Sequence, residues 1–215
     1  KKVGDFENSI EINIDFEDVV ADSLSITNIG SDNENLTLEN LNRIPEFTLQ
    51  TNSGDTTLMF LDSGLTSATD DLVINLDGAE TASTITLTKS QGSTTEEIET
   101  VSLVVDSVEN TLKTLDTDDV STSTLEVTGD ENLNITDIIG NEILTVDAGD
   151  FTGDFSFKIN SVAAATVTTG SGDDVITDTS DFGDTITSGD GDDNITTHDG
   201  ADSIISGAGD ATIDS

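Results

Sequence analysis

The sequence predicts an all-β protein that ends in a parallel β-roll or β-solenoid. First, short segments with alternating apolar and polar residues follow one another along the chain, separated by Asn, Asp, Ser, Gly and Thr. Alternation with a period of two is the pattern of half-buried strands. Second, a nine-residue unit returns five times between residues 169 and 214. A fixed repeat of this kind is typical of a solenoid, in which each unit stacks on an earlier one.

The charge balance is strongly acidic and unevenly placed. The 215 residues include 45 Asp and Glu against six Lys and Arg, which gives a formal net charge of −39. Such a charge opposes a compact state unless cations relieve it, and it argues against nucleic acid and anionic membrane surfaces as partners. Residues 166–215 hold 12 aspartates and no Lys or Arg, and no glutamate follows Glu142. A halophilic protein would carry Asp and Glu throughout, so we interpret the placement as functional.

Other features of the composition favour an extracellular protein. There is no cysteine, which excludes a disulfide framework and a Cys-based metal site. No apolar run approaches the roughly 20 residues that span a bilayer, and no charged-then-apolar leader opens the chain, so we expect no membrane insertion. Lys1 is not an initiator methionine and Ser215 ends the chain inside a repeat, so we expect a segment of a longer protein.

Residues 1–100 are expected to form a region of short strands. Alternating segments occur at residues 10–14, 24–26, 36–38, 72–76 and 85–87, and a further one follows directly after this region at residues 101–105. Pro45 lies between two of these segments and is expected in a loop or at a sheet edge. The pattern fits an irregular β-solenoid or a separate β-sandwich, and the sequence alone leaves both open.

Residues 101–165 are expected to form solenoid coils with a coarser period. Apolar residues recur there every 10 or 11 residues, and the series continues into the nonapeptides with a last step of nine. Its members are Val105, Leu115, Leu125, Ile135, Val146, Phe157, Val167 and Ile176. We therefore expect a coil that tightens gradually toward the end of the chain.

Residues 166–215 are expected to form the β-roll itself. The units are TGSGDDVIT, SDFGDTIT, SGDGDDNIT, THDGADSII and SGAGDATID, and two of them match x-G-x-G-x-D-x-U-x at every specified position. The aspartates Asp174, Asp184, Asp193 and Asp202 are 10, 9 and 9 residues apart. The isoleucines Ile176, Ile186, Ile195, Ile204 and Ile213 follow in step.

Each unit combines a turn with a short strand. Its first six residues turn the chain through glycines, which reach backbone conformations closed to other residues. These glycines are Gly170, Gly172, Gly189, Gly191, Gly200, Gly207 and Gly209. Its last three residues form a strand that points the isoleucine inward. Stacked units therefore give an isoleucine column inside and an aspartate column along each edge.

The aspartate columns predict bound calcium. Bare carboxylates stacked about 5 Å apart would repel one another, so the edges need cations. Oxygen ligands alone suit calcium, which accepts six to eight of them. We expect the four in-register aspartates to be ligands, and Asp173, Asp190 and Asp192 to contribute mainly the backbone carbonyls of their turns. A further group is expected to hold ordinary solvated turn residues: Asp178, Asp181, Asp199, Asp214 and His198.

The repeat length also predicts which aspartates share an ion. Each nonapeptide should turn the chain through half a coil, so stacked neighbours lie two units apart. Asp174 should then face Asp193, and Asp184 should face Asp202. The turn of Asp193 should meet Ala211, which offers no carboxylate.

These motifs resemble those of bacterial surface-layer proteins that carry RTX-type nonapeptide repeats. The nonapeptides carry the resemblance, together with LEVTGDENLNIT, LTVDAGDFTGDFSF and AAATVTTGSGDDVIT ahead of them. The resemblance implies type I secretion and folding on several calcium ions outside the cell. Its departures are Ser180, Phe182 and His198 in place of glycines and Ala211 in place of an aspartate.

The sequence therefore favours a calcium-dependent structural segment of a secreted surface-layer protein that self-associates into a two-dimensional lattice. A cell-surface polysaccharide is a second expected partner. The alternative is a stalk or ligand-contact module of a large RTX adhesin. An enzyme is not expected, because the single histidine lies in a turn, which leaves no credible Ser-His-Asp triad, and no Trp or Tyr is present to line a sugar groove.

Overall fold

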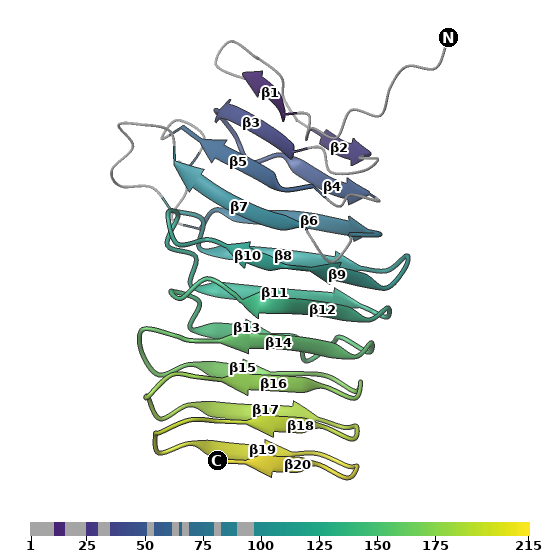
Figure 1. The fold of residues 1–215 in the computed structure, drawn as a ribbon, viewed down its shortest axis with the longest axis vertical. Coiled ribbons are helices and arrows are strands. Elements are labelled where there is room, and N and C mark those ends of the chain that lie inside the picture. Colours follow the sequence, from purple (N-terminus) through teal and green to yellow (C-terminus); the bar gives the residue numbers. More distant parts are fainter. Residues whose placement is uncertain are drawn as a thin grey trace, which may run out of the picture.

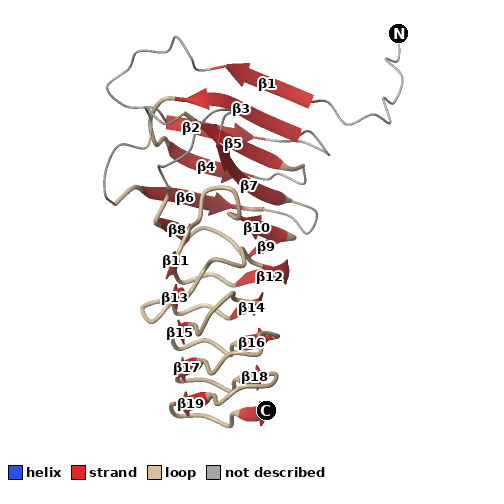
Figure 2. Ribbon diagram, turned by 90° about the vertical axis from the view of Figure 1, so that its left-hand side faces the viewer, coloured by secondary structure: helices blue, strands red, loops and turns tan. Residues whose placement is uncertain are grey.

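The computed structural model describes residues 11–15, 25–29, 35–50, 54–61, 65, 69–79, 83–89 and 97–215. In these residues the chain winds into a parallel β-solenoid (Figure 1), which confirms the predicted fold class. Its coils become narrower toward the last strands (Figure 2). No helix with the length and apolarity to cross a membrane occurs in the part of the chain so described. Ile10 and Leu24, which we placed in strands, lie outside it.

The strands form three parallel sheets of five, nine and six strands, here called sheets A, B and C. Sheet A contains β1 Glu11–Asp15, β3 Asn35–Leu41, β5 Thr56–Phe60, β7 Thr84–Lys89 and β10 Thr114–Asp116. Sheet B contains β2 Ser25–Ile29, β4 Glu46–Gln50, β6 Asp71–Asp77, β8 Thr100–Val105, β11 Thr124–Gly129, β13 Thr145–Asp147, β15 Thr166–Thr168, β17 Thr185–Gly189 and β19 Ser203–Ser206. Sheet C contains β9 Asn110–Leu112, β12 Leu133–Ile138, β14 Phe155–Ile159, β16 Val175–Asp178, β18 Asn194–Thr196 and β20 Thr212–Asp214.

Sheet B forms one face of the solenoid along its whole length, and the opposite face changes from sheet A to sheet C. The change occurs at β9 and β10, which are separated by Lys113 alone: β10 pairs with β7 before it, and β9 pairs with β12 after it. Figure 2 shows the paired columns of strands that follow. The described strands of the first hundred residues are therefore part of the solenoid, and the separate sandwich is not formed.

From β11 onward, each strand pairs with the strand two places further along the chain. Phe157 of β14 lies beside Ile176 of β16, and Val167 of β15 lies beside Ile186 of β17. Two nonapeptides therefore complete one coil, as the repeat predicted. The coils also shorten: hydrogen bonds between neighbouring coils join residues 29 apart near residue 70, 24 apart near residue 102, 22 apart near residue 132, and 19 or 18 apart in the roll.

The core becomes thinner as the coils shorten. All eight apolar residues of the coarse period, from Val105 to Ile176, are buried. Phe155 stacks on Phe157 with ring centroids 4.3 Å apart, and Phe151 packs edge-on against Phe155 at 6.0 Å. Beyond these rings the buried apolar side chains are only Ile159, Ala165, Val167, Ile176, Ile186 and Ile195. The roll therefore has little apolar surface with which to stabilise itself.

The isoleucine column is buried only where a coil stacks on it. Ile176, Ile186 and Ile195 are fully buried, whereas Ile204 is partly buried and Ile213 is 47% exposed. Ile213 lies on β20, the outermost strand of sheet C, so one side of its side chain is uncovered. The repeat thus determines that each isoleucine points inward, but its side chain is buried only where a neighbouring coil covers it.

We predict that Ile195→Ala destabilises the protein far more than Ile213→Ala. Both residues occupy the same position of a glycine-rich nonapeptide, but only Ile195 is fully enclosed. Removing an enclosed isoleucine side chain costs about 2–5 kcal/mol, and a surface change about 0.5 kcal/mol or less. Urea denaturation in saturating calcium measures both. Equal losses would contradict the stacked core.

Candidate metal centre

The turns of the roll lie on two opposite edges. Turns that lead from sheet B to sheet C form the glycine edge, which comprises residues 169–174, 190–193 and 207–211. Turns that lead from sheet C to sheet B form the irregular edge, which comprises residues 179–184 and 197–202. Because consecutive nonapeptides alternate between edges, the glycine departures Ser180, Phe182 and His198 all fall on the irregular edge.

Glycine is required where the backbones of stacked turns touch. Gly191 has φ +133°, and a Cβ there would lie 2.2 Å from the carbonyl oxygen of Gly172. Gly172, Gly191 and Gly209 stack in one column, since a Cβ on Gly209 would lie 2.0 Å from the oxygen of Gly191. The other glycines of the predicted site meet backbone in the same way: Gly170, Gly189, Gly200 and Gly207.

The four in-register aspartates stack as predicted. On the glycine edge, Asp174 N donates to Asp193 Oδ1 over 3.1 Å, and the residues are 19 apart. On the irregular edge, Asp184 N donates to Asp202 Oδ1 over 2.9 Å, and the residues are 18 apart. Asp174, Asp184 and Asp193 are almost completely buried and Asp202 is half-buried. Ala211 follows Asp193 in the column, because Asn194 pairs with Thr212.

The sequence analysis did not identify the hydroxyl groups that lie beside these aspartates. Ser188 donates its hydroxyl to Asp193 Oδ2, and Ser180 donates its hydroxyl to Asp184 Oδ2 over 2.7 Å. The Thr169 hydroxyl donates instead to Ser188 O over 2.8 Å, and Asp174 Oδ2 has no hydrogen-bond partner. The signal was a Ser or Thr four or five residues before each of these aspartates. Two of the buried carboxylates are therefore held in place by a neighbouring hydroxyl.

A second, outer column of carboxylates runs beside the first on the glycine edge. Asp173 N donates to Asp154 Oδ1, Asp192 N to Asp173 Oδ1, and Asp210 N to Asp192 Oδ1, each over 2.8 Å. Asp190 Oδ1 likewise accepts the N–H of Ala208 over 2.8 Å. We expected these residues to act mainly through backbone carbonyls, but their exposed side chains link successive coils. The Asp-Asp pairs at 173–174 and 192–193 were the sequence signal.

The prediction that Asp178 is an ordinary solvated turn residue is wrong. Asp178 is 2% exposed, and a carboxylate oxygen from each of Asp178, Asp184 and Asp202 lies within 4.8 Å of the others. Asp178 closes β16, where it pairs with Ile159, and it directly precedes the turn in which the aspartate spacing is 10 rather than 9. The end of this strand therefore places a carboxylate inside the fold.

The remaining predicted turn residues are exposed. His198 Nδ1 lies 2.9 Å from Asp181 Oδ1 on the irregular edge, and both side chains are largely in solvent. Asp199 lies near them, and Asp214 is exposed on β20. These positions agree with the solvated turns expected for them.

Burial changes the acidity of two carboxyls. It raises the pKa of Asp174 from 3.8 to about 6, with the charge of Asp193 adding to the shift. Burial also raises the pKa of Asp178, to about 7, helped by the neighbouring Asp184. Asp174 Oδ2 and Asp178 Oδ2 are both buried without a hydrogen-bond partner. A buried carboxylate oxygen without a donor is costly unless a cation compensates it. Acidic clusters that could hold a metal ion are present, and the oxygen donors of the buried one, formed by Asp178, Asp184 and Asp202, fit calcium.

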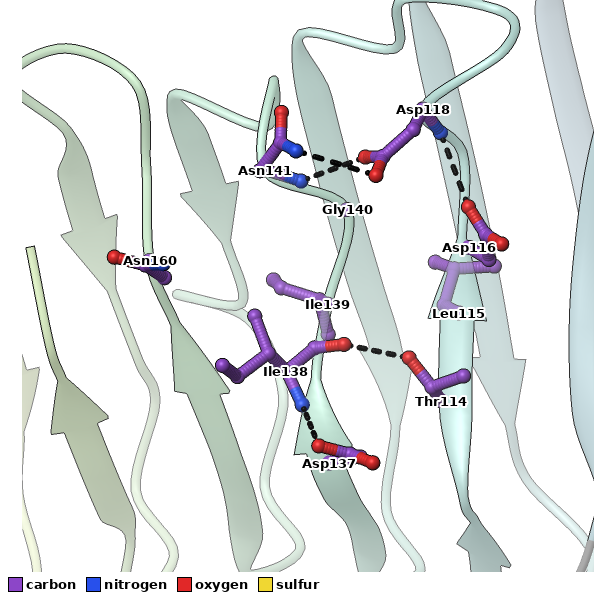
Figure 3. Close-up of a pocket in the computed structure, with 10 residues that line it drawn as sticks. All are labelled: Thr114, Leu115, Asp116, Asp118, Asp137, Ile138, Ile139, Gly140, Asn141 and Asn160. Carbon is purple, nitrogen blue, oxygen red and sulfur yellow. Dashed lines mark hydrogen bonds between the residues drawn. The ribbon is translucent and has the colours of Figure 1, made fainter.

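A surface pocket of about 330 Å³ lies beside β10 and β12 (Figure 3). Its acidic groups already accept hydrogen bonds: Asp118 from the backbone N–H and side-chain amide of Asn141, at 2.9 and 3.2 Å, and Asp137 from the N–H of Ile138 at 2.9 Å. Thr114 donates to the Ile138 carbonyl. These carboxylates serve the turn itself, so the buried carboxylates of the roll remain the candidate site.

Comparison of the chain with protein-family models, with curated proteins and with solved structures finds no match.

We predict that the ion-free protein becomes more stable as the pH falls from about 7 to about 5. The Asp174 carboxyl titrates near 6 when folded and near 3.8 when unfolded. The native state therefore takes up a proton in this window that the unfolded chain does not, at about 1.4 kcal/mol per pKa unit. Urea midpoints in calcium-depleted buffer measure the trend. Asp174→Asn should reduce the slope, whereas Asp173→Asn, an exposed neighbour, should leave this contribution in place. A slope unchanged by Asp174→Asn would contradict the assignment.

Proposed function

We propose that the chain is a calcium-dependent structural segment of a secreted bacterial surface-layer protein. One observation carries this proposal: stacked aspartates are buried along both edges of a thin parallel β-solenoid, and some of their oxygens have no hydrogen-bond partner. Bound calcium would drive folding, rigidity and lattice assembly.

The charge of the roll supports the requirement for cations. At the closest approach of two carboxylates, about 4 Å, repulsion is about 1 kcal/mol in water and rises to about 4 kcal/mol near a protein surface. Residues 166–215 contain 12 aspartates and no Lys or Arg, so no side chain of opposite fixed charge relieves this repulsion. Calcium is present at millimolar concentration outside cells. Bound between stacked aspartates, it would neutralise their repulsion and link neighbouring coils along each edge.

The shape of the molecule supports a structural role. The solenoid is a rod whose coils are joined along their whole length by parallel strand pairing (Figure 1). Calcium between neighbouring coils would resist bending at the turns, where backbone hydrogen bonds and a few side-chain contacts join the coils. The exposed aspartates of the outer column remain available to share ions with a second copy of the chain or with an acidic cell-surface polysaccharide.

A rod of this kind could equally serve as a stalk or ligand-contact module of a large RTX adhesin. Both proteins would need calcium to fold outside the cell after type I secretion. They differ in self-association, because a surface-layer subunit must form lateral contacts with copies of itself. The test is therefore assembly.

We predict that the full-length protein forms two-dimensional arrays when calcium is added, visible by negative-stain electron microscopy. The double variant Asp174→Asn with Asp193→Asn should form none or require more calcium, since it removes both inner carboxylates of the glycine edge. Asp71→Asn is the control, because Asp71 is exposed on β6 far from the roll. Monodisperse rods at every calcium concentration would contradict the surface-layer role and favour the adhesin.

A further inference from the structure

We propose that Asp178, Asp184 and Asp202 form a separate cation site on the irregular edge, and that this site binds calcium more tightly than the two-aspartate sites of the glycine edge. The inference rests on the proposed calcium dependence of the roll. It adds that the two edges are unequal and that the tighter site includes Asp178, which is not one of the four in-register aspartates.

The three carboxylates come from two neighbouring coils. Asp178 closes β16, Asp184 ends the turn after it, and Asp202 ends the equivalent turn one coil later. A carboxylate oxygen from each lies within 4.8 Å of the others. Oxygens on opposite sides of a calcium ion lie about 4.6–5.2 Å apart, so the cluster can contact one ion without rearranging the backbone.

The hydrogen bonds around the cluster leave one oxygen aimed into it without a donor. Asp178 Oδ1 accepts the N–H of Ser180 over 2.8 Å, and Asp184 Oδ2 accepts the Ser180 hydroxyl. Asp178 Oδ2 accepts nothing, although the residue is 2% exposed. A buried carboxylate oxygen in this state, beside two further carboxylates, is costly unless a cation compensates it.

A second buried oxygen without a partner belongs to the next coil. Thr197 follows Thr196, which pairs with Thr177, so Thr197 occupies the position of Asp178 one coil later. Its hydroxyl is buried and has no hydrogen-bond partner. The Asp178 position therefore carries an unpartnered oxygen in two successive coils.

Two departures from the repeat meet at this cluster. Asp178 carries a carboxylate where the next coil has Thr197, and Ser180 stands where the repeat places glycine. Ser180 positions both Asp178 and Asp184 through the two bonds described above. The irregular edge thus loses glycine but gains a third carboxylate, whereas the pair Asp174 and Asp193 has only two. Calcium affinity rises with the number of charged ligands, so the irregular edge should bind more tightly.

The test is calcium titration of the full chain by isothermal calorimetry, with calcium chloride as the probe in calcium-depleted buffer. Asp178→Asn should weaken the tightest class of sites by roughly tenfold or more, because it removes one charged ligand. Asn keeps the acceptor oxygen for the Ser180 N–H, so the turn is preserved. Asp214→Asn, an exposed change after the last isoleucine, should leave the affinity unchanged, and Asp174→Asn should weaken a looser class.

Stability provides a second readout that separates ligation from a purely structural role. Without calcium, Asp178→Asn should raise the urea midpoint, since it removes a buried charge. With saturating calcium it should lower the stabilisation that the ion provides. Loss of stability in both conditions, or a tight class unchanged by Asp178→Asn, would overturn the proposal while leaving calcium dependence intact. Absence of any calcium binding by the unmodified chain would instead overturn the proposed function itself.

Discussion

The rest of the roll depends on one contact: a buried aspartate carboxylate that accepts a backbone N–H from the neighbouring coil. Asp174 accepts the N–H of Phe155 over 2.8 Å, and its own N–H goes to Asp193. The same pattern on the opposite edge links Ala165, Asp184 and Asp202. The contact fixes the height of each coil, but it also stacks like charges in a region with little water. The aspartate contact that joins neighbouring coils is therefore also the contact that brings like charges together.

This constraint matters most where the core is thinnest. Coils near residue 70 are long and are filled by large apolar side chains, whereas the coils of 18 or 19 residues enclose little more than isoleucines. The narrow coils bury fewer apolar side chains and have more contacts at their edges. Their stability therefore depends less on apolar burial and more on the electrostatics of the edge aspartates. In the outer column, exposed carboxylates accept N–H groups from the following coil, opposite in direction to the inner column. The two columns together clamp each turn of the glycine edge from both sides.

The sequence predicted those parts of the roll that a fixed repeat determines. Aspartates and isoleucines in step at nine residues were enough to predict two units per coil and the pairing of Asp174 with Asp193. The repeat could not predict Asp178, because the repeat does not specify the residue type at this position and so says nothing about its side chain. Ser180 was seen only as a missing glycine, although its hydroxyl holds Asp184.

Farther from the repeat, the sequence left more than one fold open. Coils whose equivalent residues are 27 to 29 apart have no recurrent motif, so alternating strands there fit a sandwich as well as a solenoid. The parallel pairing of β6 with β8 resolves this, because that register cannot be deduced from alternation alone. The outer aspartates were underestimated for a related reason: adjacent aspartates look equivalent in a sequence, and only the backbone decides which of them is enclosed.

Hydrogen exchange of the full chain, followed by mass spectrometry with and without calcium, tests the central claim most directly. If cations hold the carboxylate edges together, peptides from residues 166–215 should exchange rapidly in calcium-depleted buffer and become protected when calcium is added. Peptides from residues 97–165, whose coils contain larger apolar side chains, should be protected in both conditions. Equal protection of residues 166–215 with and without calcium would contradict the account.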